Sequence, residues 1–396
     1  MIIRHPLRSR TTLLLNKSGT MIAMENSIPA QVDKVLSLGP FGNNKSLAFN
    51  VRTLYVGIQK IVNAALGIDV GPKMSLSSPV AQVLTRATLD EVFVLLKNNS
   101  VEKARQKVNL LEEYSTNLLA DTQTEEFSIF PEQELHPLSD LNSNEFLRAI
   151  ACRVREAFIR DGFTSKVELV EPTKLHYKNI EDGKALLTQL IPHVSSSTLS
   201  LVRCLLLVNG AIGSAYFNET PFMYVVGITG LSDPLQIANT LLHEALHQKM
   251  ADIRLTRRIL CEDYNDLDST TSKDLLIPWG ASSPRVFSVS LGLAAYHFYV
   301  HSALVHASAL EHLPNNTLLQ SIDGEKIVSR LVLAFERAAY LETRLRSNAV
   351  QKKMGSDGVQ FMTLMGDAMI QLQEVRLLNG TELSVHRQLE FSSSTA

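Results

Sequence analysis

The sequence predicts a mainly α-helical protein with a few short strands. Stretches whose apolar residues recur with the period of a helix follow one another along most of the chain. Segments rich in β-branched and aromatic residues are only a few residues long. With 396 residues, of which 45% are hydrophobic and 20% charged, the chain has enough apolar material for one large or two ordinary cores. We therefore expect a globular protein built mainly from packed helices.

The first region, residues 1–210, is expected to be mainly helical. Amphipathic patterns predict helices over residues 54–66, 80–96, 101–119 and 145–159. A short β-rich segment at 167–170 follows them, and a later apolar segment ends at Asn209 and Gly210. Because an Asn-Gly pair is typical of a turn, we place the boundary between two regions there.

The second region, residues 211–396, is expected to hold the buried helices. Residues 222–228 are rich in aromatic and β-branched side chains and predict a strand. Asp233 and Pro234 then predict a helix start, because an aspartate caps the first N–H groups and proline fits the first helical position. Three more helices are predicted further on: a buried one opened by Ser282-Ser283-Pro284, and amphipathic ones over 326–354 and 359–378.

Charge and cysteine content exclude several classes of protein. The formal net charge is -2 with no long run of either sign, so nothing indicates binding to nucleic acid or to an anionic membrane. The three cysteines are scattered and odd in number, which favours a reducing compartment over a disulfide framework. The N-terminus has no apolar stretch long enough for secretion. We therefore expect a cytoplasmic protein.

Residues 286–310 are the one long stretch without Asp, Glu, Lys or Arg, and such a stretch can indicate a membrane span. Three histidines and four serines lie within it, however, and these side chains are costly to place in lipid. We therefore expect a buried helix here and no membrane segment.

The segment His-Glu-Ala-Leu-His at residues 243–247 is the strongest chemical signal in the chain. In a helix, His243 and His247 lie on one face and direct two imidazoles toward a common centre, with Glu244 beside them. The motif is short, and two ordinary histidines remain the alternative interpretation. The residues around it are leucine and alanine, however, and burying such polar groups is costly without a partner. The segment therefore predicts a metal ion.

A third ligand is required, and the residues alone leave it open. The extended form of this motif would have a third histidine where this chain has Ile253. His297 and His301 share a face of the second buried helix, which would place the metal between two buried helices. The other candidates are the carboxylates of Asp252, Glu262, Asp263, Asp266 and Asp268. Charged residues in loops, however, more often contact only water.

The stretch from 241 to 301 resembles the 2-oxoglutarate-dependent peptide β-hydroxylases with an HExxH motif, found beside genes for ribosomally made, modified peptides. Its members have Leu-Val-His-Glu-Phe-x-His, then Ala-Pro-Trp-Arg-x-x-Pro-Arg-Pro, then a helix with Gly-Ala-Tyr-Ala-His. This chain has Leu-Leu-His-Glu-Ala-Leu-His, Ile-Pro-Trp-Gly-Ala-Ser-Ser-Pro-Arg-Val and Leu-Ala-Ala-Tyr-His. The resemblance implies His297 as the third ligand, with His301 as second choice. Gly280 replaces one family arginine, and Arg285 matches the other.

The resemblance implies an iron(II) and 2-oxoglutarate-dependent dioxygenase that hydroxylates the β-carbon of a residue in a precursor peptide. Arg285 is then expected to bind the distal carboxylate of 2-oxoglutarate, and Glu244 to support the metal site or to be an additional ligand. Residues 1–210 are the candidate peptide-binding region, with strand addition beside 222–228 as one mode. Residues 211–396 form the catalytic region.

Two other functions compete with hydroxylation. A zinc metallopeptidase would use the same histidines, with Glu244 as the catalytic base that takes a proton from metal-bound water. Three imidazoles with one open position suit zinc as well as iron. A third class is a binding protein whose metal site is structural or decayed, which the replacement at Gly280 favours.

Overall fold

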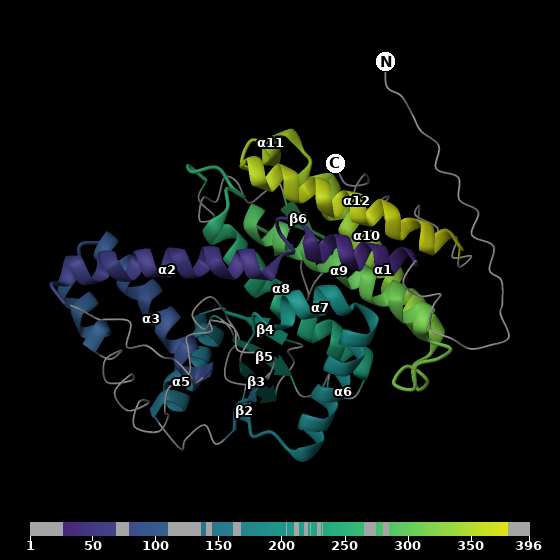
Figure 1. Cartoon of the computed structure of the whole chain (residues 1–396), viewed down its shortest axis with the longest axis horizontal. Helices are drawn as coiled ribbons and strands as arrows, with labels where there is room; N and C mark the ends of the chain where they lie inside the picture. Colours follow the sequence, from purple (N-terminus) through teal and green to yellow (C-terminus); the bar gives the residue numbers. More distant parts are fainter. Residues whose placement is uncertain are drawn as a thin grey trace, which may run out of the picture.

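The structure is a computed structural model that describes most of the chain. It covers residues 27–68, 79–109, 136–139, 145–160, 168–202, 204–209, 214–217, 221, 223–227, 231, 233–264, 275–279 and 285–378. Within these residues the protein is mainly helical with a small sheet, which confirms the predicted fold class (Figure 1).

The described helices run along nearly the whole chain. Those of the first region are α1 Ile28–Leu38, α2 Asn44–Leu66, α3 Pro79–Lys97, α5 Glu145–Arg160, α6 Lys174–Leu190 and α7 Pro192–Leu199. Those of the second region are α8 Pro234–Thr256, α9 Val289–His312, α10 Gly324–Leu345, α11 Asn348–Gln351 and α12 Ser356–Leu378. The strands are β1 His136–Pro137, β2 Glu168–Val170, β3 Cys204–Asn209, β4 Ser214–Tyr216, β5 Met223–Gly227, β6 Leu276–Ile277 and β7 Arg285–Val286.

The larger sheet has the order β1-β3-β5-β4, with β2 also paired to β3. Strand β3 lies parallel to β1 and β5, whereas β4 runs antiparallel to β5. The two regions expected on either side of residue 210 therefore share one sheet, because β3 precedes that residue and β5 follows it. β5 has a neighbour on each side, so the strand addition expected beside residues 222–228 is wrong: both of its edges are occupied.

The alternation of side chains along β3 explains why helices cover both faces of the sheet. Leu205 and Leu207 pack against α6 and α8, together with Leu241 and Ala245 of α8. Cys204, Leu206 and Val208 belong to a second cluster with α3 and α5, which includes Leu84 and Ile150. Because both faces are buried, β3 is almost continuously apolar, as is typical of a central parallel strand.

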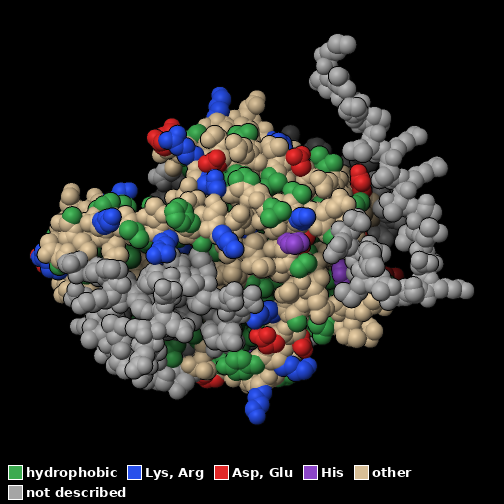
Figure 2. Space-filling model, viewed as in Figure 1, with side chains coloured by type: hydrophobic (Ala, Val, Ile, Leu, Met, Phe, Trp, Pro, Cys, Tyr) green, Lys and Arg blue, Asp and Glu red, His purple; other side chains and the backbone are tan. Residues whose placement is uncertain are grey.

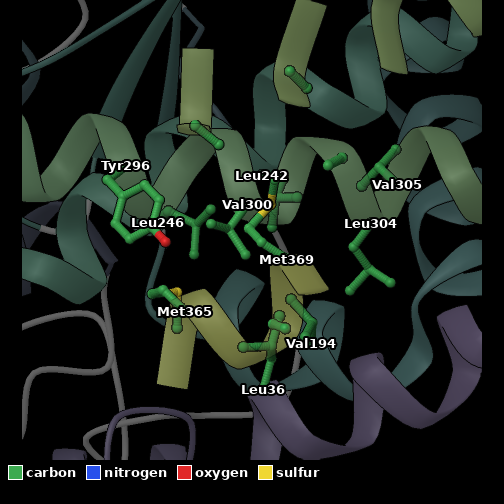
Figure 3. Packing of buried hydrophobic residues seen from close by; sticks show 14 of the residues in the cluster. Leu36, Val194, Leu242, Leu246, Tyr296, Val300, Leu304, Val305, Met365 and Met369 are labelled. Atoms are coloured by element: carbon green, nitrogen blue, oxygen red, sulfur yellow. The ribbon is translucent and has the colours of Figure 1, made fainter. Parts of the chain in front are cut away.

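Helix α9 is the centre of the largest hydrophobic cluster. It begins after Ser288, whose Oγ accepts a hydrogen bond of 3.2 Å from Leu291 N. Its buried residues lie around the whole helix and pack against α1, α8, α10 and α12, as Figure 3 shows for Val300 beside Leu242 and Leu246. The buried helix expected over 286–310 is thus confirmed. No helix of the described residues combines the length and apolarity needed to cross a membrane.

Several predicted helices are confirmed with different ends. Helix α2 starts ten residues earlier than expected, because Asn43 caps it by accepting from Ser46 N at 3.2 Å. Residues 101–109 are helical, and the rest of the predicted 101–119 helix lies outside the described residues. The helix expected over 326–354 is divided into α10 and α11, with Ser347 as the cap residue of the second.

The helix expected to open at Ser282-Ser283-Pro284 begins later, at Val289. Arg285 and Val286 are extended instead, because they pair with Ile277 and Leu276 as strands β7 and β6. The sequence pattern there was correct for a helix start but assigned it to the wrong serine.

Charged side chains are dispersed over the face of the molecule that Figure 2 shows. On the face shown in Figure 2, basic and acidic side chains are interspersed and do not gather into one patch of either sign. This distribution agrees with the formal net charge of -2.

The contact between α6 and α8 gives a test of the packing. A Cβ added at Gly183 would lie 2.4 Å from Ile237 Cγ2, so Gly183→Ala forces the two helices apart and should lower the free energy of unfolding by about 1–3 kcal/mol. Urea unfolding measures this. Gly57→Ala is the matched control, since nothing lies within 4 Å of its added Cβ, and it should raise stability by about 0.5–1 kcal/mol. Equal effects from the two variants would contradict the packing.

Candidate metal centre

Asp233 sets the start of α8, the helix that carries the histidine pair. Its Oδ1 accepts hydrogen bonds from Leu235 N at 3.0 Å and Gln236 N at 3.1 Å. Its Oδ2 accepts from Lys326 at 3.1 Å and Arg330 at 2.9 Å, both on α10. Burial raises the pKa of Asp233, but these bonds stabilise the carboxylate more and leave its pKa below the ordinary value. The predicted cap is confirmed and also ties α8 to α10.

His243 and His247 are brought together as the sequence predicted. They lie one turn apart on α8, and their Nε2 atoms are 3.0 Å from each other. A metal ion bound by two imidazoles lies about 2.1 Å from each nitrogen, so two nitrogens at this separation can share one ion. Burial, followed by the neighbouring His247, lowers the pKa of His243 well below its usual range. Burial likewise lowers the pKa of His247 to about 4. Both rings are therefore neutral at pH 7 and can bind a metal, which needs the unprotonated nitrogen.

Glu244 lies beneath this pair and against the sheet. Its side chain is 1% exposed, and its Oε1 accepts a hydrogen bond of 2.5 Å from Ser214 Oγ on β4. The same oxygen lies 3.2 Å from His243 Nδ1. Burial raises the pKa of Glu244 to about 8, although the Ser214 bond lowers it in part. A carboxyl oxygen that accepts a hydrogen bond from Nδ1 would hold the imidazole in the tautomer that leaves Nε2 for a metal, and Glu244 Oε1 lies within reach of that nitrogen.

His297 lies on α9 and is 2% exposed. Its ring packs against His301 and Phe361, at centroid distances of 4.5 and 5.3 Å. Its Nδ1 is buried and has no hydrogen-bond partner. Burial lowers its pKa well below the usual range, and His301, Lys249 and His247 lower it further.

No third ligand joins the pair within the described residues. No group of three or more His, Cys, Asp or Glu side chains in this part of the chain is close enough to hold a metal ion. His297 is therefore not brought into one group with His243 and His247. His301, the second choice, uses Nδ1 to donate to the carbonyl oxygen of His297 at 2.8 Å.

The acidic candidates from the sequence are placed elsewhere. Asp252 is completely buried, and its Oδ1 accepts from Arg86 at 2.5 Å and from Gln248 at 3.0 Å. It is thus half of a buried ion pair that joins α3 to α8. Glu262 and Asp263 are exposed, while Asp266 and Asp268 lie outside the described residues.

The Pro-Trp segment lies against α9 and α10. Trp279 Nε1 donates to Tyr299 Oη at 3.1 Å, and the same oxygen accepts from Arg337 at 3.1 Å. Arg285 lies in β7, but its side chain, like the whole of Gly280, is outside what the structure describes. The expected contact of Arg285 with 2-oxoglutarate stays a prediction.

Phe298 is a site residue that the sequence reasoning did not identify. Its ring lies against the ring of His243, with centroids 3.9 Å apart and planes inclined by 32°. Phe298 therefore limits how His243 can turn and brings α9 next to the pair. Its position directly after His297 was the only signal for it.

Neither a protein-family model nor a curated protein sequence matches this chain. The site is therefore interpreted from its own geometry: two facing imidazoles, one buried carboxyl on His243, and an aromatic ring from the neighbouring helix.

Buried histidines on α9 predict how stability depends on pH. Burial lowers the pKa of His301 to about 3 and that of His306 to about 4, whereas both return to about 6.5 when the chain unfolds. Below pH 6.5 the unfolded chain binds more protons than the folded chain. The contribution of these histidines to the free energy of unfolding is therefore fully present above pH 6.5 and is lost as the pH falls toward 4. Each histidine contributes a slope of up to about 1.4 kcal/mol per pH unit.

Urea unfolding between pH 8 and pH 4 measures this loss. His306→Gln should unfold with a shallower pH dependence than the unchanged protein, because one of the buried histidines whose pKa is lowered is removed. The quantity to compare is the slope of the free energy of unfolding against pH. A packing defect caused by the substitution lowers this free energy at every pH, including pH 8, and leaves the slope unchanged. An unchanged slope would contradict the buried neutral state of His306.

Proposed function

We propose that this protein is an iron(II)- and 2-oxoglutarate-dependent oxygenase that hydroxylates the β-carbon of a residue in a ribosomally synthesised peptide. The observation that favours hydroxylation over peptide hydrolysis is the contact of Glu244 Oε1 with His243 Nδ1 at 3.2 Å. A peptidase needs this carboxylate beside metal-bound water. Here it supports the outer nitrogen of a ligand, as carboxylates do around many metal sites.

His243, His247 and His297 are the ligands in this proposal. The facing Nε2 atoms of the first two support it, as does the buried, unpartnered Nδ1 of His297. The lowering of the pKa of His297 by His247, although smaller than the effects of burial, His301 and Lys249, also supports grouping the two rings. A turn of the His297 side chain toward the pair is the rearrangement that the proposal requires.

Bound iron, with 2-oxoglutarate and oxygen, would supply the oxidising equivalent for hydroxylation. The residues of the chain then have three tasks. Glu244 and Ser214 orient His243, Phe298 restricts its ring and excludes water from that side, and the apolar surroundings keep the histidines neutral. The peptide is proposed to lie along β4, which carries Ser214 and pairs only with β5 among the described strands.

Anaerobic purification with iron(II), followed by metal analysis and an assay for succinate formed from 2-oxoglutarate, tests the reaction. His243→Ala and His247→Ala should lose both iron and succinate formation, because each removes one of two facing nitrogens. His193→Ala is the matched control, since that exposed imidazole lies far along the chain from the pair and its hydrogen bond to Asp33 uses the backbone. It should behave as the unchanged protein.

Glu244→Gln separates hydroxylation from hydrolysis. Glutamine keeps an oxygen for Ser214 and for His243 Nδ1, so succinate formation should persist while iron affinity falls by about 10–100-fold. In a zinc peptidase the same change removes the base, and peptide cleavage should collapse. Tightly bound zinc with peptide cleavage that depends on Glu244, and no succinate, would overturn the proposal.

A further inference from the structure

A cavity of about 300 Å³ lies between α8, α9 and α10, and one of its lining residues is Phe298, whose ring lies against that of His243. We call it the α10 pocket. Its walls include two arginines of α10, Arg330 and Arg337, and the buried residues Ser302 and His306 of α9. None of its lining residues is acidic. Its size is at the lower end of the range for small-molecule sites.

Both arginines have N–H groups for which no acceptor is found among the described residues. Arg330 donates through Nη2 to Asp233 Oδ2 at 2.9 Å, while its Nη1 is buried without a partner. Arg337 donates through Nη1 to Tyr299 Oη at 3.1 Å, while its Nε is buried without a partner. Unsatisfied buried donors on charged groups are costly. Two of them beside one cavity indicate an acceptor that comes from outside the chain.

Besides the arginines, the polar side chains that line the pocket include the neutral amides of Gln236 and Asn239 and the imidazole of His306, and none of these supplies that acceptor as an anion. Burial lowers the pKa of His306 to about 4, and the charge of Arg330 lowers it further. Its Nδ1 lies 2.7 Å from the carbonyl oxygen of Ser302 and is therefore the protonated nitrogen. Asp233 is shared between Arg330 and Lys326, and a neutral His306 adds no negative charge, so the basic groups at the pocket outnumber this carboxylate. The pocket therefore favours a negatively charged ligand.

The apolar walls narrow the class of anion. Arg330 and Arg337 are seven residues apart, which places them on one face of α10 two turns from each other. Leu333 and Ala334 lie between them, and Phe298 forms part of the opposite wall. A ligand that fits has an anionic group for a planar guanidinium and a short apolar body for these side chains.

We propose that the α10 pocket binds a small organic carboxylate through Arg330 and Arg337. The proposal concerns the protein without metal, so it holds or fails independently of the proposed hydroxylation. Because Phe298 lines the pocket and also lies against His243, a ligand there would sit next to the metal-binding pair.

The single tryptophan of the chain provides a direct measurement. The guanidinium of Arg337 lies 5.3 Å from the ring centroid of Trp279, and both side chains donate to Tyr299 Oη. A carboxylate that binds Arg337 changes this arrangement and hence the fluorescence of Trp279. Metal-free, full-length protein titrated with glutarate should show a saturable change, with calorimetry as a second measurement of the same affinity. Inorganic phosphate should bind more weakly, because it has no apolar body.

Substitutions of the two arginines test whether glutarate binds in the α10 pocket. Arg337→Gln and Arg330→Lys should each weaken glutarate binding by at least about tenfold, the loss expected for one charge-assisted hydrogen bond. The lysine keeps a positive charge near Asp233 and so protects the cap of α8. Arg344→Gln, an exposed arginine on the same helix outside the pocket, is the matched control and should bind glutarate normally.

Circular dichroism and urea unfolding confirm that each variant is folded before it is titrated. No saturable binding of glutarate by the folded, unchanged protein would overturn the proposal. Equal affinity of the Arg337→Gln variant would also overturn it, and preference for phosphate over glutarate would overturn the assignment to carboxylates.

Discussion

The position of α8 between the sheet and α9 decides the surroundings of every polar group in the candidate site. Leu241 and Ala245 contact the sheet, whereas Leu242 and Leu246 pack into the cluster around α9 (Figure 3). Because two faces of α8 make apolar contacts, the helix cannot rotate, and the positions of the residues between these faces are fixed. His243 and His247 lie on the part of the α8 surface between these two faces. Glu244 points toward the sheet and contacts Ser214 of β4.

Asp233 connects this helix to the rest of the protein. One carboxylate oxygen caps α8, and the other binds Lys326 and Arg330 of α10. The same arginine lines the α10 pocket, and its second amino group, Nη1, is buried without a partner among the described residues. A single capping residue therefore sets the start of the helix that carries His243 and His247 and positions one wall of the proposed carboxylate site.

Several basic side chains are buried in this core, and their burial is unfavourable for the stability of the fold unless they find hydrogen-bond partners. Lys249 is 1% exposed, and burial lowers its pKa to about 7. Its Nζ donates to the carbonyl oxygen of Gly42 at 3.1 Å and to the hydroxyls of Ser197 and Thr198. These neutral acceptors replace the water that burial removes. Lys249 thus joins α7, α8 and the residues before α2, while its charge helps to keep His297 unprotonated.

The sequence by itself determined the helical fold class, the cap at Asp233 and the pairing of His243 with His247. All three depend on residues close together in the chain, whose relation a helix determines without help from elsewhere. It could not determine the role of Asp252, because its partner Arg86 lies on a distant helix. Nor could it show that β5 lies inside the sheet, that Phe298 covers His243, or that Arg330 and Arg337 share a pocket with α9. Those relations depend on how α8, α9 and α10 pack, and packing between distant segments is decided only by the tertiary structure.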